Sequence, residues 1–209
     1  MADIVVKEKK PDQNMVRFCG VIIWKQESAT KMTITVRVTT KEGNRTYTNY
    51  PRLSVFNEDL KAQINALPLR VPVVVEGYVT STKQRRDENG ALIPFPENTP
   101  IQSFVAESVR LAEEGEPESN EITVVGSVEA AFVSKNGNIN FVIVSFRDGR
   151  YMKRIRMGAF RRSDVDYLSM MAAGTRVQAI GHCSTFTAET RDGDRVPREY
   201  LVIDQIEKA

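Results

Sequence analysis

The chain has 209 residues, of which 41% are hydrophobic and 27% charged, and its net charge is +2 at pH 7. This composition is ordinary for a globular protein, and the length suits one large domain or two of about 100 residues. The sequence has no apolar run of about 18 residues and no signal-peptide pattern at its start, so we expect a cytoplasmic protein without a transmembrane helix.

Hydrophobic alternation in the first part of the chain predicts five strands and one short helix. In chain order these are strands 16–23, 34–38 and 50–56, helix 58–67, and strands 73–79 and 103–109. Gly20 and Gly77 lie inside the first and fourth strands. Glycine weakens a strand, so its presence there predicts a bulge or a sharp bend where the sheet curls.

A connector follows at 111–121, LAEEGEPESNE, which contains glycine, proline, serine and five acidic residues but almost no apolar side chain. This composition predicts a linker, which we place at 113–121. The flanking segments are both mildly basic once the acidic run is set aside. Such a balance is weak evidence for an anionic partner, since excess basic charge also aids solubility.

The same order of elements recurs after the connector. We predict strands 122–129, 140–146 and 153–157, helix 163–172, and strands 177–183 and 199–206. Gly126 and Gly181 lie inside the first and fourth of these strands, at nearly the spacing of Gly20 and Gly77. Glycine is unfavourable within a strand, so two copies that share it at these positions indicate a duplication. Cys19 and Cys183 lie far apart in apolar segments, which favours buried, reduced thiols.

Five strands with a helix between the third and fourth are the layout of an OB-fold, a small Greek-key barrel. We therefore predict an all-β chain with short helices, built as two tandem five-stranded OB-fold barrels. The first barrel spans residues 1–112, the acidic linker 113–121 and the second barrel 122–209. The alternative is a pair of small open sheets packed as a sandwich.

The third strand of the first copy, YPRLSVF, has an unusual outer face. Leu53 and Val55 share one face, whereas Tyr50, Arg52 and Phe56 share the other. OB-folds bind oligonucleotides or oligosaccharides on the second and third strands, so the rings are candidates to stack on bases and the arginine to hold a phosphate. The alternative is that Phe56 turns inward and Tyr50 covers the barrel mouth.

Other aromatic and basic side chains extend this candidate site. The loop 80–100 is basic at its start and reads as an arm that folds over a nucleic acid, or as a solvated hairpin. Further candidates for stacking are Trp24, Tyr47, Phe95 and Phe186, although Trp24 can equally cap the core. Further candidates for phosphate contacts are Arg45, Lys83, Arg85, Arg86, Lys153, Arg154, Arg156, Arg191 and Arg195.

In the second copy we align the stretch MKRIRMG with YPRLSVF. This alignment places Arg154 at the position of Arg52, and puts Met152 and Gly158 where the first copy has its aromatic side chains. The second face is then more basic and poorer in stacking groups. We expect the first copy to stack bases and the second mainly to hold the backbone.

At these residues the chain resembles the bacterial and phage single-stranded DNA-binding protein (SSB) family. The matches, over about residues 14–112, are N-x-V-x-x-x-G at 14–20, aromatic-x-R-x-x-x-F at 50–56, and V-x-V-E-G at 73–77 followed by a basic loop with D-E-N-G. The resemblance implies that Tyr50 and Phe56 stack on bases. It also implies a partner, single-stranded DNA, a role in replication or recombination, and a bacterial cell or phage-infected host.

The chain departs from the family in two respects. Gln84 stands where the family often has a tryptophan, and the chain ends in VIDQIEKA rather than in an acidic tail finishing in Pro-Phe, so recruitment of replication proteins by such a tail is not implied. Some family members carry two OB-folds in one chain and pair to give four. The resemblance therefore implies a homodimer.

Catalytic and metal-binding patterns are scarce. His182 is the single histidine, on a strand that we predict to be buried, and it cannot form a zinc site with two distant cysteines alone. No P-loop, dinucleotide fingerprint or nucleophile elbow is present. We expect no enzyme and no cofactor. The alternatives to DNA coating are an OB-fold scaffold for proteins and an RNA-binding OB protein.

Overall fold

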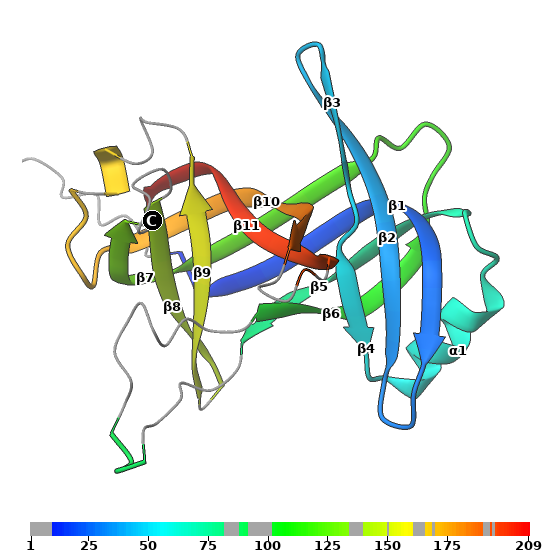
Figure 1. Cartoon of the computed structure of the whole chain (residues 1–209), viewed down its shortest axis with the longest axis horizontal. Coiled ribbons are helices and arrows are strands. Elements are labelled where there is room, and N and C mark those ends of the chain that lie inside the picture. Colours follow the sequence, from blue (N-terminus) through cyan, green and yellow to red (C-terminus); the bar gives the residue numbers. More distant parts are fainter. Residues whose placement is uncertain are drawn as a thin grey trace, which may run out of the picture.

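The structure, a computed structural model, describes residues 10–81, 88–91, 102–133, 140–149, 151–160, 166–168, 170–189, 193 and 195–209. Its strands are β1 (Gln13–Glu27), β2 (Met32–Glu42), β3 (Arg45–Asn49), β4 (Arg52–Val55), β5 (Pro72–Ser81), β6 (Gln102–Leu111), β7 (Ser119–Val133), β8 (Asn140–Asp148), β9 (Tyr151–Ala159), β10 (Arg176–Glu189) and β11 (Arg195–Lys208). The helix α1 spans Glu58–Ala66. The strands form one sheet in the order β10-β11-β9-β8-β7-β1-β5-β6-β4-β2-β3 (Figure 1).

Two additional strand pairings close this sheet into two barrels. β1 pairs with β2, which closes β1, β5, β6, β4 and β2 on themselves, and β10 pairs with β7, which closes β7, β8, β9, β11 and β10. The two predicted five-stranded barrels are thus confirmed. The first copy has one more strand than expected, because β3 forms a hairpin with β2 that projects from the barrel (Figure 1).

The two barrels are joined by an antiparallel pairing of β1 with β7. Val16 lies opposite Ile122, Arg17 opposite Glu121, and Met15 opposite Thr123. Val16 and Ile122 are both fully buried. Each of these strands is 15 residues long, so its first part can pair with the other barrel while the rest closes its own. Val16 and Ile122, at the centre of this pairing, are equivalent residues of the two copies. The pairing therefore relates the barrels by an approximate two-fold axis.

The four strand glycines predicted to mark bulges or bends allow neighbouring backbones to approach more closely than any side chain permits. A Cβ atom placed on Gly20 or Gly126 would lie 2.2 or 2.3 Å from a carbonyl oxygen of the adjacent strand. At Gly77 and Gly181 the distance would be 1.9 or 1.8 Å. Contacts under 3.0 Å are not tolerated by real Cβ atoms, so these glycines are required by close approach.

An asparagine side chain, half-buried at Asn14 and buried at Asn120, ties the first strand of each barrel to its fourth. Asn14 Nδ2 donates to the carbonyl of Val79 at 2.7 Å, and the Val79 N–H donates back to Asn14 Oδ1 at 3.1 Å. Asn120 makes the same pair of bonds with Cys183, at 2.8 and 2.9 Å. Each asparagine stands six residues before the first strand glycine of its barrel, so the duplication extends to side-chain hydrogen bonds.

The acidic connector is bonded to the first barrel. β7 begins at Ser119, inside the segment predicted as a linker. The Glu116 carboxylate lies 2.6 Å from a guanidinium nitrogen of Arg17 and 2.6 Å from one of Arg110. Glu118 accepts a hydrogen bond from the backbone N–H of Thr39 on β2. These carboxylates hold the connector in place.

The segment before β1 makes the corresponding contacts with the second barrel. Asp12 accepts a hydrogen bond from the backbone N–H of Arg147 at 2.7 Å and pairs with Arg176 at 2.6 Å. Burial on its own would raise the pKa of Asp12, but the Arg147 N–H and the Arg176 guanidinium together lower it. The segments that precede β1 and β7 therefore each carry a carboxylate to the opposite barrel.

Three smaller expectations have different outcomes. Cys19 and Cys183 are buried free thiols, as predicted. His182 is half-buried rather than buried, and its Nδ1 lies 2.8 Å from a carboxylate oxygen of Asp204. The second predicted helix, 163–172, falls partly outside the described residues, of which 166–168 are helical. No helix among the described residues is long and apolar enough to cross a membrane.

Replacing Asn120 with alanine should strongly destabilise the second barrel. It would leave a backbone N–H and a backbone carbonyl of Cys183 buried without partners, and each unpaired group costs about 1–3 kcal/mol. We expect the free energy of unfolding, measured by urea denaturation, to fall by about 2–4 kcal/mol. The control is Asn44→Ala, at an exposed turn position. Equal losses in the two variants would contradict the role of the Asn120 side chain.

Acid should remove a stabilising contribution of Glu116. The hydrogen bond from Arg110, helped by the Glu113 N–H and by Arg17, lowers the pKa of Glu116 from 4.5 to about 2. A carboxylate whose pKa is lowered by folding stabilises the protein above its unfolded pKa, and this stabilisation is lost as the pH falls through the folded value. The difference in unfolding free energy between wild type and Glu116→Gln should therefore be full at pH 7 and shrink between pH 4.5 and about 2.

The control for this experiment is Glu114→Gln, which removes an exposed carboxylate of the same connector. No ion pair of Glu114 is found among the described residues. Its stability difference from wild type should stay small across the same range of pH. A Glu116→Gln difference that does not change with pH would show that the carboxylate contributes nothing through its charge.

Candidate functional site

A groove of about 1310 Å³ lies between the outer face of the first barrel and the β10–β11 hairpin of the second. Five residues predicted from the sequence line it, namely Trp24, Tyr50, Arg52, Arg156 and Phe186. The sequence reasoning missed other aromatic and charged residues of the same groove, namely Lys31, Arg198, Glu199 and Tyr200. Rings and guanidinium groups from both barrels therefore face one continuous space.

Local irregularities in β1 and before β4 direct the first barrel's side chains into the groove. The register of β1 against β2 shifts between Ile22 and Trp24, and this bulge leaves Trp24 39% exposed. Pro51 lies between β3 and β4, and its carbonyl accepts a hydrogen bond from the N–H of Val36 at 3.1 Å. Tyr50 and Arg52 flank this buried proline and are both exposed.

The entry to β4 is bonded to the hairpin of the second barrel. The N–H of Tyr50 donates to Thr185 Oγ1 at 3.0 Å, and the N–H of Thr185 donates to Asn49 Oδ1 at 2.9 Å. The N–H of Arg52 donates to Glu199 Oε1 at 2.8 Å. These bonds fix the width of the groove at the point where the tyrosine and the arginine enter it.

A reciprocal contact is made in the opposite direction. Gln102, at the start of β6 in the first barrel, donates from Nε2 to the carbonyl of Arg156 at 3.1 Å and accepts from the Arg156 N–H. Glu199, near the start of β11, makes the corresponding bond to the N–H of Arg52. Each barrel therefore holds the backbone of one groove arginine of the other.

The strand register corrects our alignment of the second copy. Arg52 lies opposite Thr35, which lies opposite Trp24, just past the bulge in β1. Arg156 lies opposite Ile143, which lies opposite the residue just past the bulge in β7. Arg156 is therefore the counterpart of Arg52, two residues beyond the Arg154 that we aligned with it.

The corrected alignment restores an aromatic residue to the second copy. Phe160 now corresponds to Phe56, and both side chains are about half exposed, at 47% and 54%. Met152 and Gly158 do not stand in the positions of the aromatic residues. Arg154 instead forms an ion pair with Glu129 at 2.7 Å. The sequence-based alignment was wrong because the ends of the predicted strands carry no information on register.

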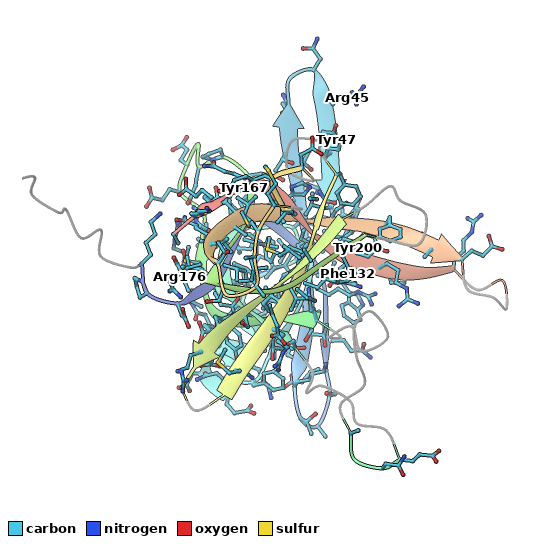
Figure 2. All side chains as sticks on the ribbon, turned by 90° about the vertical axis from the view of Figure 1, so that its left-hand side faces the viewer. Arg45, Tyr47, Phe132, Tyr167, Arg176 and Tyr200 are labelled. Atoms are coloured by element: carbon cyan, nitrogen blue, oxygen red, sulfur yellow. The ribbon has the colours of Figure 1, made fainter. Side chains whose placement is uncertain are left out.

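The second barrel contributes a pair of rings to the groove wall. Phe186 and Tyr200 contact each other with ring centroids 4.9 Å apart and planes inclined by 37°. The guanidinium carbon of Arg156 lies 6.0 Å from the centroid of Tyr200. Figure 2 shows Tyr200 on the strands of the second barrel. Its position could have been found from the alternation along β11, where Leu201 and Ile203 are buried and Tyr200 has the other parity.

The remaining predicted residues lie elsewhere. Arg45 and Tyr47 are on the projecting β2–β3 hairpin (Figure 2), and neither residue lines the groove. Phe56 follows the end of β4 and does not line the groove. Lys153 is half-buried on β9 and Arg195 is exposed at the start of β11. Five predicted residues lie outside the described part of the chain, namely Lys83, Arg85, Arg86, Phe95 and Arg191.

The charged side chains of the groove are mostly basic. Among the described residues that line it, Lys31, Arg52, Arg156 and Arg198 are cationic and Glu199 is the one carboxylate. Burial raises the pKa of Glu199, and the Arg52 N–H and the Arg52 charge offset this in part. Burial lowers the pKa of Arg156. A groove with this balance of charge has a positive electrostatic potential and also exposes flat aromatic rings.

Metal ligands are not gathered anywhere in the described residues. No group of three or more histidine, cysteine, aspartate or glutamate side chains lies close enough there to hold an ion.

The sequence matches no protein-family model and no curated protein. The fold, however, matches solved structures over nearly the whole chain. Wild-type single-stranded DNA binding protein from Thermus aquaticus is similar with a TM-score of 0.64 at 15% identity, covering 96% of this chain and 94% of that one. A deletion mutant of the same protein gives a TM-score of 0.65 at 12% identity, covering 95% of each chain. At these identities the likeness establishes a shared fold.

Proposed function

We propose that this chain is a tandem OB-fold member of the SSB family that binds single-stranded DNA without reading its sequence. The observation that carries the proposal is the groove between the barrels, where Trp24, Tyr50, Phe186 and Tyr200 accompany four basic side chains. The fold shared with the Thermus aquaticus protein supports it. In this proposal the two binding units are residues 1–112 and 122–209, joined by 113–121.

Binding would combine two physical contributions. Basic side chains displace the counterions that surround phosphates, which makes the logarithm of affinity fall with that of salt concentration by about 0.7 per phosphate contacted. The aromatic faces stack on bases, at about 1–3 kcal/mol per base, and accept any base because every base has a π-face. The groove contains both kinds of group, and its walls come from both barrels, so one strand contacts both barrels at once.

We further propose that the protein coats and protects single strands during replication or recombination, and that two chains pair to give four barrels. The role in replication or recombination and the association of two chains both follow from the family resemblance of the sequence, and not from contacts in the structure. Sedimentation equilibrium would distinguish a dimer from a monomer. The same fold could instead serve as a scaffold for other proteins or bind RNA. The titration below distinguishes these two functions from binding of single-stranded DNA.

The test is a titration of Trp24 fluorescence with poly(dT), duplex DNA and poly(U) at two salt concentrations. We expect tight, salt-sensitive binding to poly(dT) and weak binding to the duplex. A double variant, Tyr50→Ala with Arg52→Ala, should lose about 10- to 100-fold in affinity for poly(dT), because it removes one stacking ring and one phosphate contact. Its salt dependence should also become shallower, by about 0.7 in slope.

The matched control is Tyr47→Ala with Arg45→Ala. This pair removes the same two side chains at the same spacing, but from the β2–β3 hairpin outside the groove. We expect a much smaller loss. Equal losses in both double variants would place the binding site outside the groove. No binding of wild type at low salt would contradict DNA binding and favour a scaffold, and a preference for poly(U) would favour an RNA-binding protein.

A further inference from the structure

One acidic side chain stands among the basic groups of the groove. Glu199 is half-buried on β11, in the same groove as Arg52, Arg156, Lys31 and Arg198, and it is the one carboxylate among the described lining residues. A negative charge in a groove for a polyanion opposes binding of phosphates. Such a residue either has a structural role that needs its charge or contacts a part of the ligand that is not a phosphate.

The duplication provides an internal comparison that excludes the structural role. Gln102 is the counterpart of Glu199, because Val105 and Val202 occupy equivalent places opposite the parallel partner strands β4 and β9. Gln102 bonds both the N–H and the carbonyl of Arg156, whereas Glu199 bonds the N–H of Arg52. A neutral amide therefore bonds the backbone of the opposite arginine in one case. A carboxylate is not needed for the equivalent bond in the other.

The carboxylate also has unused capacity to accept hydrogen bonds. Among the described residues, its one hydrogen-bond donor is the N–H of Arg52, which occupies Oε1. An ionised carboxylate can accept about four hydrogen bonds. Burial raises the pKa of this group, which means that the charged form is under-solvated where it stands. A ligand that brings N–H donors into the groove would satisfy it.

We propose that Glu199 makes the groove prefer bases that carry an exocyclic amino group, an inference that rests on the proposed function. Phosphates are repelled by the carboxylate, so the part of a bound strand that faces it is a base edge. The 4-amino group of cytosine and the 6-amino group of adenine donate hydrogen bonds, and carboxylates accept from them. Uracil and thymine present a carbonyl oxygen at the corresponding position, which a carboxylate repels, and their N3–H donor lies between two such oxygens. The rings beside Glu199 still stack on any base, so the result is a compositional preference and not sequence readout.

The test compares deoxycytidine and deoxyuridine oligomers of about 20 nucleotides, long enough for two OB-folds. These bases are closely matched in shape and differ at two adjacent atoms: cytosine has the 4-amino group and an unprotonated N3, whereas uracil has a 4-carbonyl group and an N3–H. Dissociation constants are measured by fluorescence anisotropy at mildly alkaline pH, for wild type and for Glu199→Gln. We expect wild type to favour the deoxycytidine oligomer by about tenfold more than the variant does, which is about 1.4 kcal/mol and close to the lower end of the range for a hydrogen bond to a charged group.

The variant Glu199→Gln is chosen to preserve the fold, since Gln102 shows that an amide can bond the backbone at this position. The control is Glu207→Gln, which removes the same charge from the same strand at an exposed site paired with Lys10. Circular dichroism melting of both variants establishes that they are folded. The control should bind both oligomers with the wild-type ratio of affinities.

Each outcome bears on a different statement. A smaller cytosine preference in Glu199→Gln with a wild-type ratio in Glu207→Gln supports the proposal. Equal ratios in wild type and Glu199→Gln overturn it, even if the variant binds both oligomers more tightly, because the carboxylate would then act only by repelling phosphates. If wild type binds neither oligomer nor poly(dT), the proposed function itself fails.

Discussion

The antiparallel pairing of β1 with β7 is the interaction on which the rest of the structure depends. Its centre, Val16 opposite Ile122, places two equivalent residues against each other, and both are excluded from solvent. An antiparallel pair centred in this way fixes the relative orientation of the barrels. It also merges their apolar residues into one core, so that neither barrel is bounded by a solvated interface at this seam.

The groove follows from this arrangement. Once the barrels are related by an approximate two-fold axis, the β5–β6 strands of one and the β10–β11 hairpin of the other reach across to the opposite barrel. Gln102 then bonds the backbone of Arg156, and Glu199 bonds that of Arg52. Because the two barrels belong to one chain, the equivalent positions have been free to differ. At one such position Gln102 has an amide and at the other Glu199 has a carboxylate. Our inference about base preference depends on this difference.

The acidic connector shows why composition alone misjudges a segment. Its composition predicted a linker, but it did not show that Glu116 pairs with two arginines and that Glu118 accepts a backbone N–H of β2. Asp12 makes the corresponding contact with the second barrel, where it accepts the backbone N–H of Arg147 on β8. A carboxylate that receives an N–H at the border of a barrel satisfies a donor that the strand ladder leaves open, so these charges belong to the structure.

The sequence predicted the described strands other than β3, the duplication and the class of fold, because the alternation of apolar side chains and the glycines within strands report local geometry directly. It also placed Tyr50 and Arg52 on one outer face, since the face of a side chain follows from its position along a strand. It did not determine that Arg156, not Arg154, matches Arg52, nor that Tyr200 and Glu199 share the groove. Asn120, which repeats Asn14 at the same distance from a strand glycine, was visible in the sequence and was overlooked.

Register between strands and hydrogen bonds such as that from the Arg52 N–H to Glu199 join residues far apart in the chain. Only the tertiary structure decides them, because a periodicity of two specifies the face of a side chain and not its partner.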